Sequence, residues 1–352
     1  MAKFLEPHRR PLGGFEIIDV VEESDVEAIR SRLDVPCPTA VRWNDWDYGS
    51  TVAELRALYD KGKQHQWDAS HELDWELPLT RDVWIGDPNA SILASTCKQL
   101  GGDEKAVKAA LFDEVNYVLS QLLHGEQAAL QLCGQLTNIC PETDEKLYAA
   151  QQAADEARHT EVFARFLAEK FGTLYPVSPV IKTLLDELLS AEGFHKKTLG
   201  MQTLFEGVAM GIFSGLRASM SHPLLVEMIR RVELDESRHA AFGVLTMRRV
   251  MGEIDEAERA ELEDWALSIL ETLNAAQQMH MLRILGPKYG IDAERLTKRI
   301  VAMPEFPLFN SMVYMHTVIP NLQRLGLITE RTESKYRAVG LMSDIRGEPS
   351  AN

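Results

Sequence analysis

The 352-residue sequence has few cysteines, no long apolar run and no excess of basic residues. Its four cysteines, Cys37, Cys97, Cys133 and Cys140, show no C-x-x-C spacing, which argues against a zinc or rubredoxin-type site and favours free thiols. No apolar run approaches the roughly 18 residues of a membrane span, and the first residues lack the apolar core of a signal peptide. We therefore expect a protein of the reducing cytoplasm that does not enter a membrane.

The charge balance is strongly acidic, with a formal net charge of −16. Because no basic stretch is available to neutralise phosphates, neither a nucleic acid nor an anionic membrane surface is an expected partner. The sequence also lacks a G-x-G-x-x-G fingerprint after a strand and any cysteine cluster, so no flavin, nicotinamide or iron–sulfur group is predicted. A redox reaction would therefore need an external electron donor, such as a ferredoxin or a separate reductase, or electrons from the substrate itself.

The hydrophobic pattern is helical throughout, and no strand-period segment stands out. A capping box at 51–54 predicts a helix to about residue 70, and a shorter helix should end near Gly193. We predict one all-α domain, with N-terminal helices and an irregular wrap over 1–102, a four-helix bundle over 103–252 and further helices over 253–352. The long helices are predicted over 103–137, 143–172, 194–219, 221–252 and 255–286.

Two pentapeptides, Asp155-Glu-Ala-Arg-His159 and Asp235-Glu-Ser-Arg-His239, are almost identical. Each places a Glu and a His on one helix face, and each follows a lone Glu on an earlier predicted helix by 30 residues. A Glu from each of two helices and a Glu-x-x-His pair from each of two others form a dinuclear metal site in a helical bundle. The predicted ligands and catalytic residues are Glu126, Glu156, His159, Glu206, Glu236 and His239. Glu192 and His195 share the spacing, but they lack the flanking Asp and Arg and are interpreted as a coincidence.

The four glutamates lie on otherwise apolar faces, where unpaired buried carboxylates would be costly or would stay protonated. Two divalent cations would neutralise them, and a carboxylate-rich set with two imidazoles suits iron or manganese. Asp155 and Asp235 are placed to accept the outer ring N–H of the histidines crosswise, Asp155 from His239 and Asp235 from His159. Arg158 and Arg238 would orient these aspartates, although all four could also form ordinary helix-surface ion pairs.

The doubled D-E-x-R-H motif with its upstream glutamates resembles the ferritin-like di-iron carboxylate superfamily. Members include multicomponent monooxygenase hydroxylases, acyl-carrier-protein desaturases and ribonucleotide reductase small subunits. The resemblance implies a ferritin-like four-helix bundle, two irons (or an Mn/Fe pair) that activate O2, and bridging roles for Glu156 and Glu236. It also implies a homodimer and a small organic substrate that is hydroxylated, N-oxygenated, desaturated or cleaved.

The sequence departs from its relatives at several positions. Phe163 occupies the place of the radical-storing tyrosine of reductase subunits, and Ala209 and Met210 occupy the place of a threonine found in monooxygenases and desaturases. Thr203 is a weak substitute as proton donor. Val232 stands where the N-oxygenases carry an additional histidine, so their seven-ligand centre is not expected.

Several other residues have two interpretations each. Residues that either line a substrate pocket or belong to the core are Cys133, Phe163, Phe205, Met210, Phe213 and Phe242. Aromatic residues that either carry electrons or close the end of the bundle are Trp43, Trp46, Trp67 and Trp75. We expect a surface or interface role for His124. Two alternative functions stay open: an iron or manganese ferroxidase or storage protein, and a radical-generating reductase-like subunit.

Overall fold

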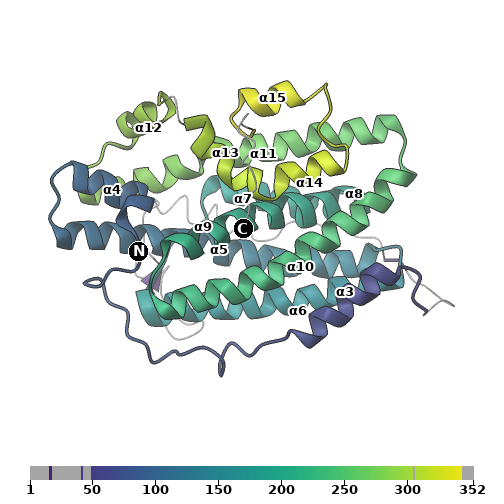
Figure 1. Ribbon diagram of the computed structural model, residues 1–352, viewed down its shortest axis with the longest axis horizontal. Coiled ribbons are helices and arrows are strands. Elements are labelled where there is room, and N and C mark those ends of the chain that lie inside the picture. Colours follow the sequence, from purple (N-terminus) through teal and green to yellow (C-terminus); the bar gives the residue numbers. More distant parts are fainter. Residues whose placement is uncertain (1–15, 18–40, 43–48, 304–305, 343–352) are drawn as a thin grey trace, which may run out of the picture.

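The computed structural model describes residues 16–17, 41–42, 49–303 and 306–342, without the side chains of 16–17, 275–278 and 306–310. The described part of the chain folds mainly into helices (Figure 1). The main helices are α3 (Ala53–Gln64), α4 (Ile92–Gln99), α5 (Glu104–Ile139), α6 (Thr143–Phe166), α7 (Pro179–Ser190), α8 (Phe194–Thr198), α9 (Glu206–Ser219), α10 (Pro223–Glu253), α11 (Glu256–Leu285), α12 (Ala293–Val301), α13 (Phe306–His316), α14 (Val318–Arg324) and α15 (Glu333–Ala338). The shorter elements are the 3-10 turns η2 (Pro88–Ala90) and η5 (Gly286–Tyr289), the π-helices η3 (Leu167–Phe171) and η4 (Leu199–Phe205), and the strands β1 (Glu16–Ile17) and β2 (Thr173–Leu174).

Four long segments form the ferritin-like bundle that the sequence predicts. Helix α5 packs against α6, and α10 packs against η4 and α9, while α6 and α10 also touch each other. Helix α3 lies across α6 and α10, α7 packs between α5 and α11, and α13 covers α9 (Figure 1). The bundle is thus enclosed on several sides by the additional helices.

Local sequence explains where the bundle helices begin and end. The side chain of Asp103 accepts a hydrogen bond from Ala106 N–H at the start of α5, and Glu142 and Glu145 form a capping box at the start of α6. At the far end, η3 stops at Gly172, whose φ of 70° is a left-handed conformation that glycine adopts without strain. These signals fix the register of the first helix pair.

The bundle contains two large apolar clusters, and the predicted metal ligands lie between them. On α5, Leu123 belongs to one cluster and Ala128 to the other, so Glu126 marks the change from one to the other. The same change occurs on α9 between Val208 and Ala209, within one turn after Glu206. The polar site therefore lies in the interior of the bundle, with apolar packing above and below it.

Three details differ from the sequence-based expectations. The segment 194–219 is interrupted, because η4 separates α8 from α9. The capping box predicted at Thr51 is wrong: α3 begins after Val52 without a side-chain cap, and Thr51 Oγ1 donates to Glu142 instead. Two residues of β2 pair in parallel with β1, a strand too short to leave a pattern.

The remaining sequence-based expectations fare differently. No helix in the described part of the chain is both long and apolar enough to cross a membrane. The division into one domain with three regions stays a prediction. Trp43, Trp46 and Cys37 lie outside the described residues.

Candidate metal centre

The six predicted ligands lie together in the interior of the bundle. Their donor atoms form two groups, each with all atoms within 4.8 Å of one another. The first group contains Glu126 and His159, and the second contains Glu206 and His239. Glu156 and Glu236 belong to both groups. Two adjacent positions that share two carboxylates are the arrangement a dinuclear centre requires.

Four helices supply these side chains. Glu126 comes from the middle of α5, Glu156 and His159 from α6, and Glu236 and His239 from α10. Glu206 is the first residue of α9, directly after the π-helix. All six are buried, with at most 6% of the residue exposed.

The inner nitrogen of each histidine faces carboxylates. His159 Nδ1 lies 3.3 Å from Glu126, 3.2 Å from Glu156 and 3.1 Å from Glu236. His239 Nδ1 lies 2.9 Å from Glu236 and 3.2 Å from Glu156, with Glu206 at 3.8 Å. Both imidazoles and all four carboxylates therefore point toward the same small volume.

The outer nitrogens reach across to the other motif's aspartate. His159 Nε2 lies 3.1 Å from Asp235 Oδ2, and His239 Nε2 lies 3.4 Å from Asp155 Oδ2. Arg158 donates to both aspartates, at 2.6 Å to Asp155 and 2.9 Å to Asp235. This arrangement holds the proton on Nε2 and leaves Nδ1 free to ligate a cation.

The electrostatics of the site favour cations. Burial raises the pKa of Glu126 to about 8 and the pKa of Glu206 well above its usual range. Burial lowers the pKa of His239, but the facing carboxylates of Glu156 and Glu236 outweigh it and raise that pKa to about 10. The polypeptide alone must therefore keep protons among these groups. Two divalent cations would balance four carboxylates in their place, so the donor set fits iron or manganese.

Sequence reasoning missed two glutamines beside the cluster. Gln152 Nε2 donates to Glu156 at 2.9 Å and to Glu206 at 2.8 Å, and Gln202 Nε2 donates to Gln152 Oε1 at 2.8 Å. Both glutamines are fully buried. Each precedes a predicted ligand by four residues, Glu156 and Glu206, so the same-face spacing of the sequence contained the signal.

Sequence reasoning also missed a contact that joins the segment after α3 to the metal centre. The indole Nε1 of Trp67 donates to Asp235 Oδ2 at 2.8 Å, so Trp67, Asp235 and His159 form a continuous hydrogen-bonded chain. Gln66 occupies the corresponding place at the other aspartate, donating to Asp155 at 2.8 Å. Of the remaining tryptophans, Trp75 is buried and donates to a backbone carbonyl.

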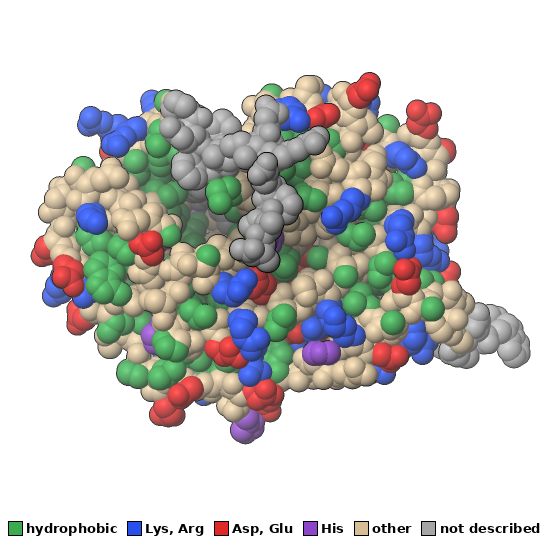
Figure 2. All heavy atoms as spheres, viewed as in Figure 1, with side chains coloured by type: hydrophobic (Ala, Val, Ile, Leu, Met, Phe, Trp, Pro, Cys, Tyr) green, Lys and Arg blue, Asp and Glu red, His purple; other side chains and the backbone are tan. Residues whose placement is uncertain are grey.

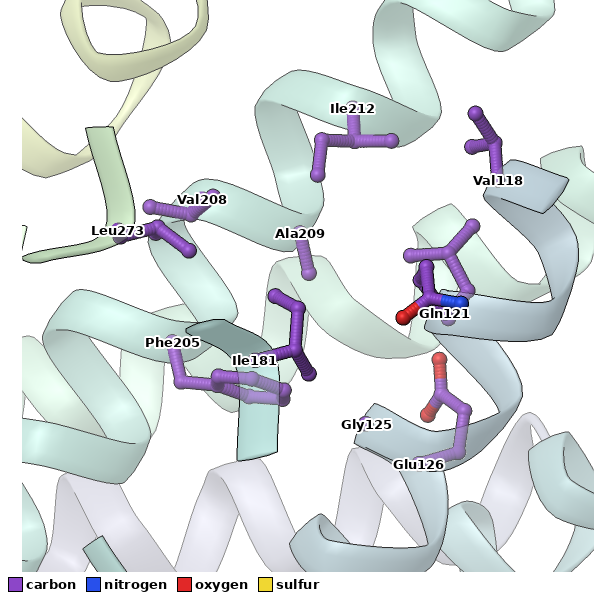
Figure 3. Close-up of a pocket in the computed structure, with 11 residues that line it drawn as sticks. Val118, Gln121, Gly125, Glu126, Ile181, Phe205, Val208, Ala209, Ile212 and Leu273 are labelled. Atoms are coloured by element: carbon purple, nitrogen blue, oxygen red, sulfur yellow. The ribbon is translucent and has the colours of Figure 1, made fainter. Parts of the chain in front are cut away.

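A pocket of about 60 Å³ adjoins Glu126, between α5, α7, η4, α9 and α11 (Figure 3). Phe205 lines this pocket, but Cys133, Phe163, Met210 and Phe213 do not. Phe163 and Phe213 instead stack on each other with ring centroids 6.1 Å apart. Cys133 is fully buried in the core.

Three other expectations concern residues outside the centre. Phe242 stacks on Tyr148 in the core, with ring centroids 4.5 Å apart. His124 is half-buried and hydrogen-bonds the carbonyl of Tyr175 at 2.9 Å, and its expected surface or interface role stays a prediction. His195 pairs with Glu258 at 2.6 Å and takes no part in either metal-ligand group.

Comparisons with known proteins agree with this geometry. The family model described as p-aminobenzoate N-oxygenase AurF matches residues 50–298. Among solved structures, an R2-like ligand-binding oxidase variant with an Mn/Fe cofactor is 16% identical with a TM-score of 0.50, covering 81% of this chain and 96% of its own. A second variant of that oxidase gives the same identity and TM-score, with 80% and 99% coverage. These structural similarities show the fold. A comparison with curated proteins found no match.

Proposed function

The chain belongs to the p-aminobenzoate N-oxygenase AurF family, and we propose that it works through two irons held by six side chains. It is an O2-dependent oxidoreductase with a ferritin-like fold. An Mn/Fe pair is the alternative cofactor, since the structurally similar oxidase is described with one. The proposed ligands are Glu126, Glu156, His159, Glu206, Glu236 and His239.

One observation supports this proposal above the others: Glu156 and Glu236 each belong to both groups of ligand atoms. A carboxylate with two oxygens can bind one cation with each of them, which keeps two cations adjacent. Glu126 with His159 and Glu206 with His239 would then complete the two positions separately.

The protein's own groups position and insulate this centre. When bound, the reduced irons would supply electrons to O2 and, with it, the oxidising power toward the substrate. Asp235 and Asp155 hold the Nε2 protons of the two histidines, and Gln152 fixes Glu156 and Glu206 by donating to both. The apolar clusters on either side exclude water from the site.

The centre proposed here has six protein ligands. Family membership holds although Val232, fully buried in the core, stands where N-oxygenases carry an additional histidine.

Ala209, in place of the threonine of other relatives, lines the pocket. The Oγ1 of Thr203 is buried without a hydrogen-bond partner in the described part of the chain, which supports it as a proton-donating group. The family's name makes N-oxygenation the first reaction to test.

We also propose a source of electrons, an oligomeric state and a cellular location. A ferredoxin or separate reductase would supply electrons, and the chain Trp67–Asp235–His159 offers a hydrogen-bonded route from α3's end to the centre. We place the enzyme in the cytoplasm as a homodimer, by analogy with the superfamily. Figure 2 shows basic and acidic side chains interspersed over one face, which gives no support to a nucleic-acid partner there.

Two alternatives predict different measurements. A storage or ferroxidase protein would accumulate many irons per chain, whereas this proposal stops at two. A radical-generating subunit would need an oxidisable side chain beside the centre, and Phe163 is a buried phenylalanine packed on another ring.

Substitution of ligands tests the proposal. Anaerobic loading with Fe(II) should give two irons per chain in the wild type, with O2 consumption on exposure to air. Glu156→Ala and His239→Ala should lose iron and O2 consumption while circular dichroism stays helical. Glu161→Ala, at an exposed position of the same helix as Glu156, is the control and should keep both irons. Full iron occupancy in Glu156→Ala would contradict the proposed ligands.

A further inference from the structure

A second cavity, of about 370 Å³, lies apart from the metal centre. It is enclosed by residues 79–81, by α5, by the segment that runs from η3 through β2 to Tyr175, and by η5. Its volume is within the range of small-molecule sites. Asp113 lines this cavity and precedes Glu126 on α5 by 13 residues, which corresponds to about 20 Å along the helix. A molecule in this cavity is therefore too far from the metal ligands to react there.

The lining of this cavity is positively charged. Arg81, Lys170 and Lys288 contribute three cations, and Asp113 contributes one carboxylate. Asp113 is already satisfied, because Arg81 lies 2.8 Å from its Oδ1 while the Tyr289 hydroxyl lies 2.7 Å from its Oδ2. Arg81 and Lys288 keep about half of their side chains exposed, at 52% and 48%. In a chain with a formal net charge of −16, this local excess of cations favours an anion.

The hydroxyl of Tyr175 is a buried donor that no described residue uses. Tyr175 lines the cavity and is fully buried, and its hydroxyl has no hydrogen-bond partner within the described part of the chain. Burial raises the pKa of this hydroxyl well above its ordinary value of 10, so the group stays protonated and can donate. A buried polar group without a partner is unfavourable, and an oxygen acceptor on a ligand would remove that cost.

The remaining wall of the cavity is largely apolar. Leu79, Phe112 and Phe171 form it, and the two rings lie with their centroids 4.4 Å apart. The guanidinium of Arg81 lies 5.4 Å from the centroid of the Phe112 ring, a cation–π contact that holds the charge beside the apolar surface. The cavity thus offers cations and a hydroxyl donor on one part of its surface and aromatic rings on another.

We infer that this cavity is a second binding site, which takes a small organic anion. The carboxylate or phosphate group of this anion would bind the cationic side chains and the Tyr175 hydroxyl, and its apolar part would contact the two phenylalanine rings. Such a ligand would hold together the four parts of the chain that surround the cavity. The inference does not depend on the proposed function, because the metal ligands lie far from the site.

Three probes that share a ring and differ in their head group test this site. Isothermal titration calorimetry of anaerobic, Fe(II)-loaded protein at constant ionic strength would compare cyclohexanecarboxylate, cyclohexylphosphonate and the neutral cyclohexanecarboxamide. We expect saturable binding of at least one anion, at least about tenfold tighter than that of the amide. The tighter of the two anions identifies the head group as carboxylate or phosphate. No saturable binding of either anion, or equal binding of the amide, would overturn the inference.

Tyr175→Phe removes only the hydroxyl. Because this hydroxyl has no described partner, the variant should unfold at the same denaturant concentration as the wild type or a higher one, and should bind the anion about tenfold more weakly. Tyr336→Phe is the matched control, since it removes another buried hydroxyl without a described partner, away from the cavity lining. It should bind the anion like the wild type.

Lys288→Gln tests the charge independently of the hydroxyl and should weaken anion binding at least about threefold. Lys335→Gln, at an exposed position on α15, is its control and should bind normally. An anion that binds at the irons would be insensitive to both cavity variants, so unchanged affinity in Tyr175→Phe and Lys288→Gln would contradict the site. Iron content is measured separately: fewer than two irons in the wild type would contradict the proposed function and leave this inference standing.

Discussion

At the scale of single residues, the two histidines are supported in different ways. Asp235 Oδ2 accepts from Trp67, Arg158 and His159, whereas Asp155 receives the amide of Gln66 instead of an indole. The two halves of the duplicated motif are therefore alike in their ligands but not in their surroundings. The asymmetry provides a reason for the two metal positions to differ in affinity.

Asp235→Asn should weaken metal binding without unfolding the protein. An amide no longer supplies the carboxylate that holds the Nε2 proton of His159, and loss of such a partner typically lowers metal affinity about 10- to 100-fold. Competition with a chelator measures this affinity. Asp264→Asn, whose carboxylate is 53% exposed in its pair with Arg331, is the control and should bind metal normally. Unchanged affinity in Asp235→Asn would show that the contact has no such role.

The sequence could predict the ligands because duplication made them visible. Two copies of Asp-Glu-x-Arg-His, each with a Glu at the same offset, specify chemistry and position together. Gln152 and Gln202 were missed because glutamine is common on helices, and only their place opposite Glu206 and beside each other gives them a role. Trp67 was recognised as an aromatic residue of interest, but its partner Asp235 lies 168 residues away in the sequence.

At the scale of elements, the π-helix η4 brings Gln202 and Glu206 to the centre. This segment packs tightly on α10 at Gly243, where an added Cβ would lie 2.6 Å from both Gln202 Cβ and its carbonyl oxygen. The close approach of η4 to α10 requires glycine at this position of α10. Sequence periodicity cannot reveal the π-helix, because its wider turn depends on contacts with another helix.

Gly243→Ala should therefore destabilise the fold and weaken metal binding together. Overpacking of this kind costs on the order of 1–3 kcal/mol, and a shift of Gln202 would disturb its bond to Gln152. Denaturant unfolding and Fe(II) titration measure the two effects. Gly134→Ala lies at an open position within α5 and should be neutral or stabilising by up to about 1 kcal/mol. Equal stability of the two variants would contradict the close packing.

The start of α3 is held by another helix. Asp144 of α6 accepts hydrogen bonds from Thr51 N–H at 2.9 Å and Val52 N–H at 2.8 Å, and pairs with Arg56 at 2.6 Å. The Asp144 carboxylate therefore caps the start of α3 in place of the capping box predicted at Thr51. It docks α3 onto α6, next to the segment that carries Gln66 and Trp67.

Asp144→Ala should lower the free energy of unfolding by about 1–3 kcal/mol at neutral pH, from the lost cap and ion pair. Burial raises the pKa of Asp144, but the Val52 N–H and Arg56 outweigh it and hold this pKa below the ordinary 3.8. Because the pKa of this carboxyl is lower in the folded than in the unfolded protein, the ionised group stabilises the fold at any pH above its unfolded pKa. This stabilisation is lost as the pH falls through the folded pKa. The difference between wild type and variant should therefore shrink below about pH 3.8; a constant difference would contradict this role.

At the scale of the whole molecule, the bundle places a charged site between two apolar clusters, and the outer helices α7 and α11 complete the pocket beside it. The fold class and the bundle were predictable, because long amphipathic helices and a doubled motif are properties of the sequence. The pocket was not. Its lining combines Val118, Ile181, Phe205 and Leu273 from separate elements, and only their packing shows that Phe205 faces the cavity while Phe163 and Phe213 fill the core.

The most direct test of the dinuclear centre is anomalous diffraction at the iron edge from crystals of the Fe(II)-loaded protein. Two peaks per chain are expected inside the bundle, one touching Glu126 and His159 and the other touching Glu206 and His239. Both should contact Glu156 and Glu236. A single peak, or peaks confined to the surface with these side chains unliganded, would contradict it.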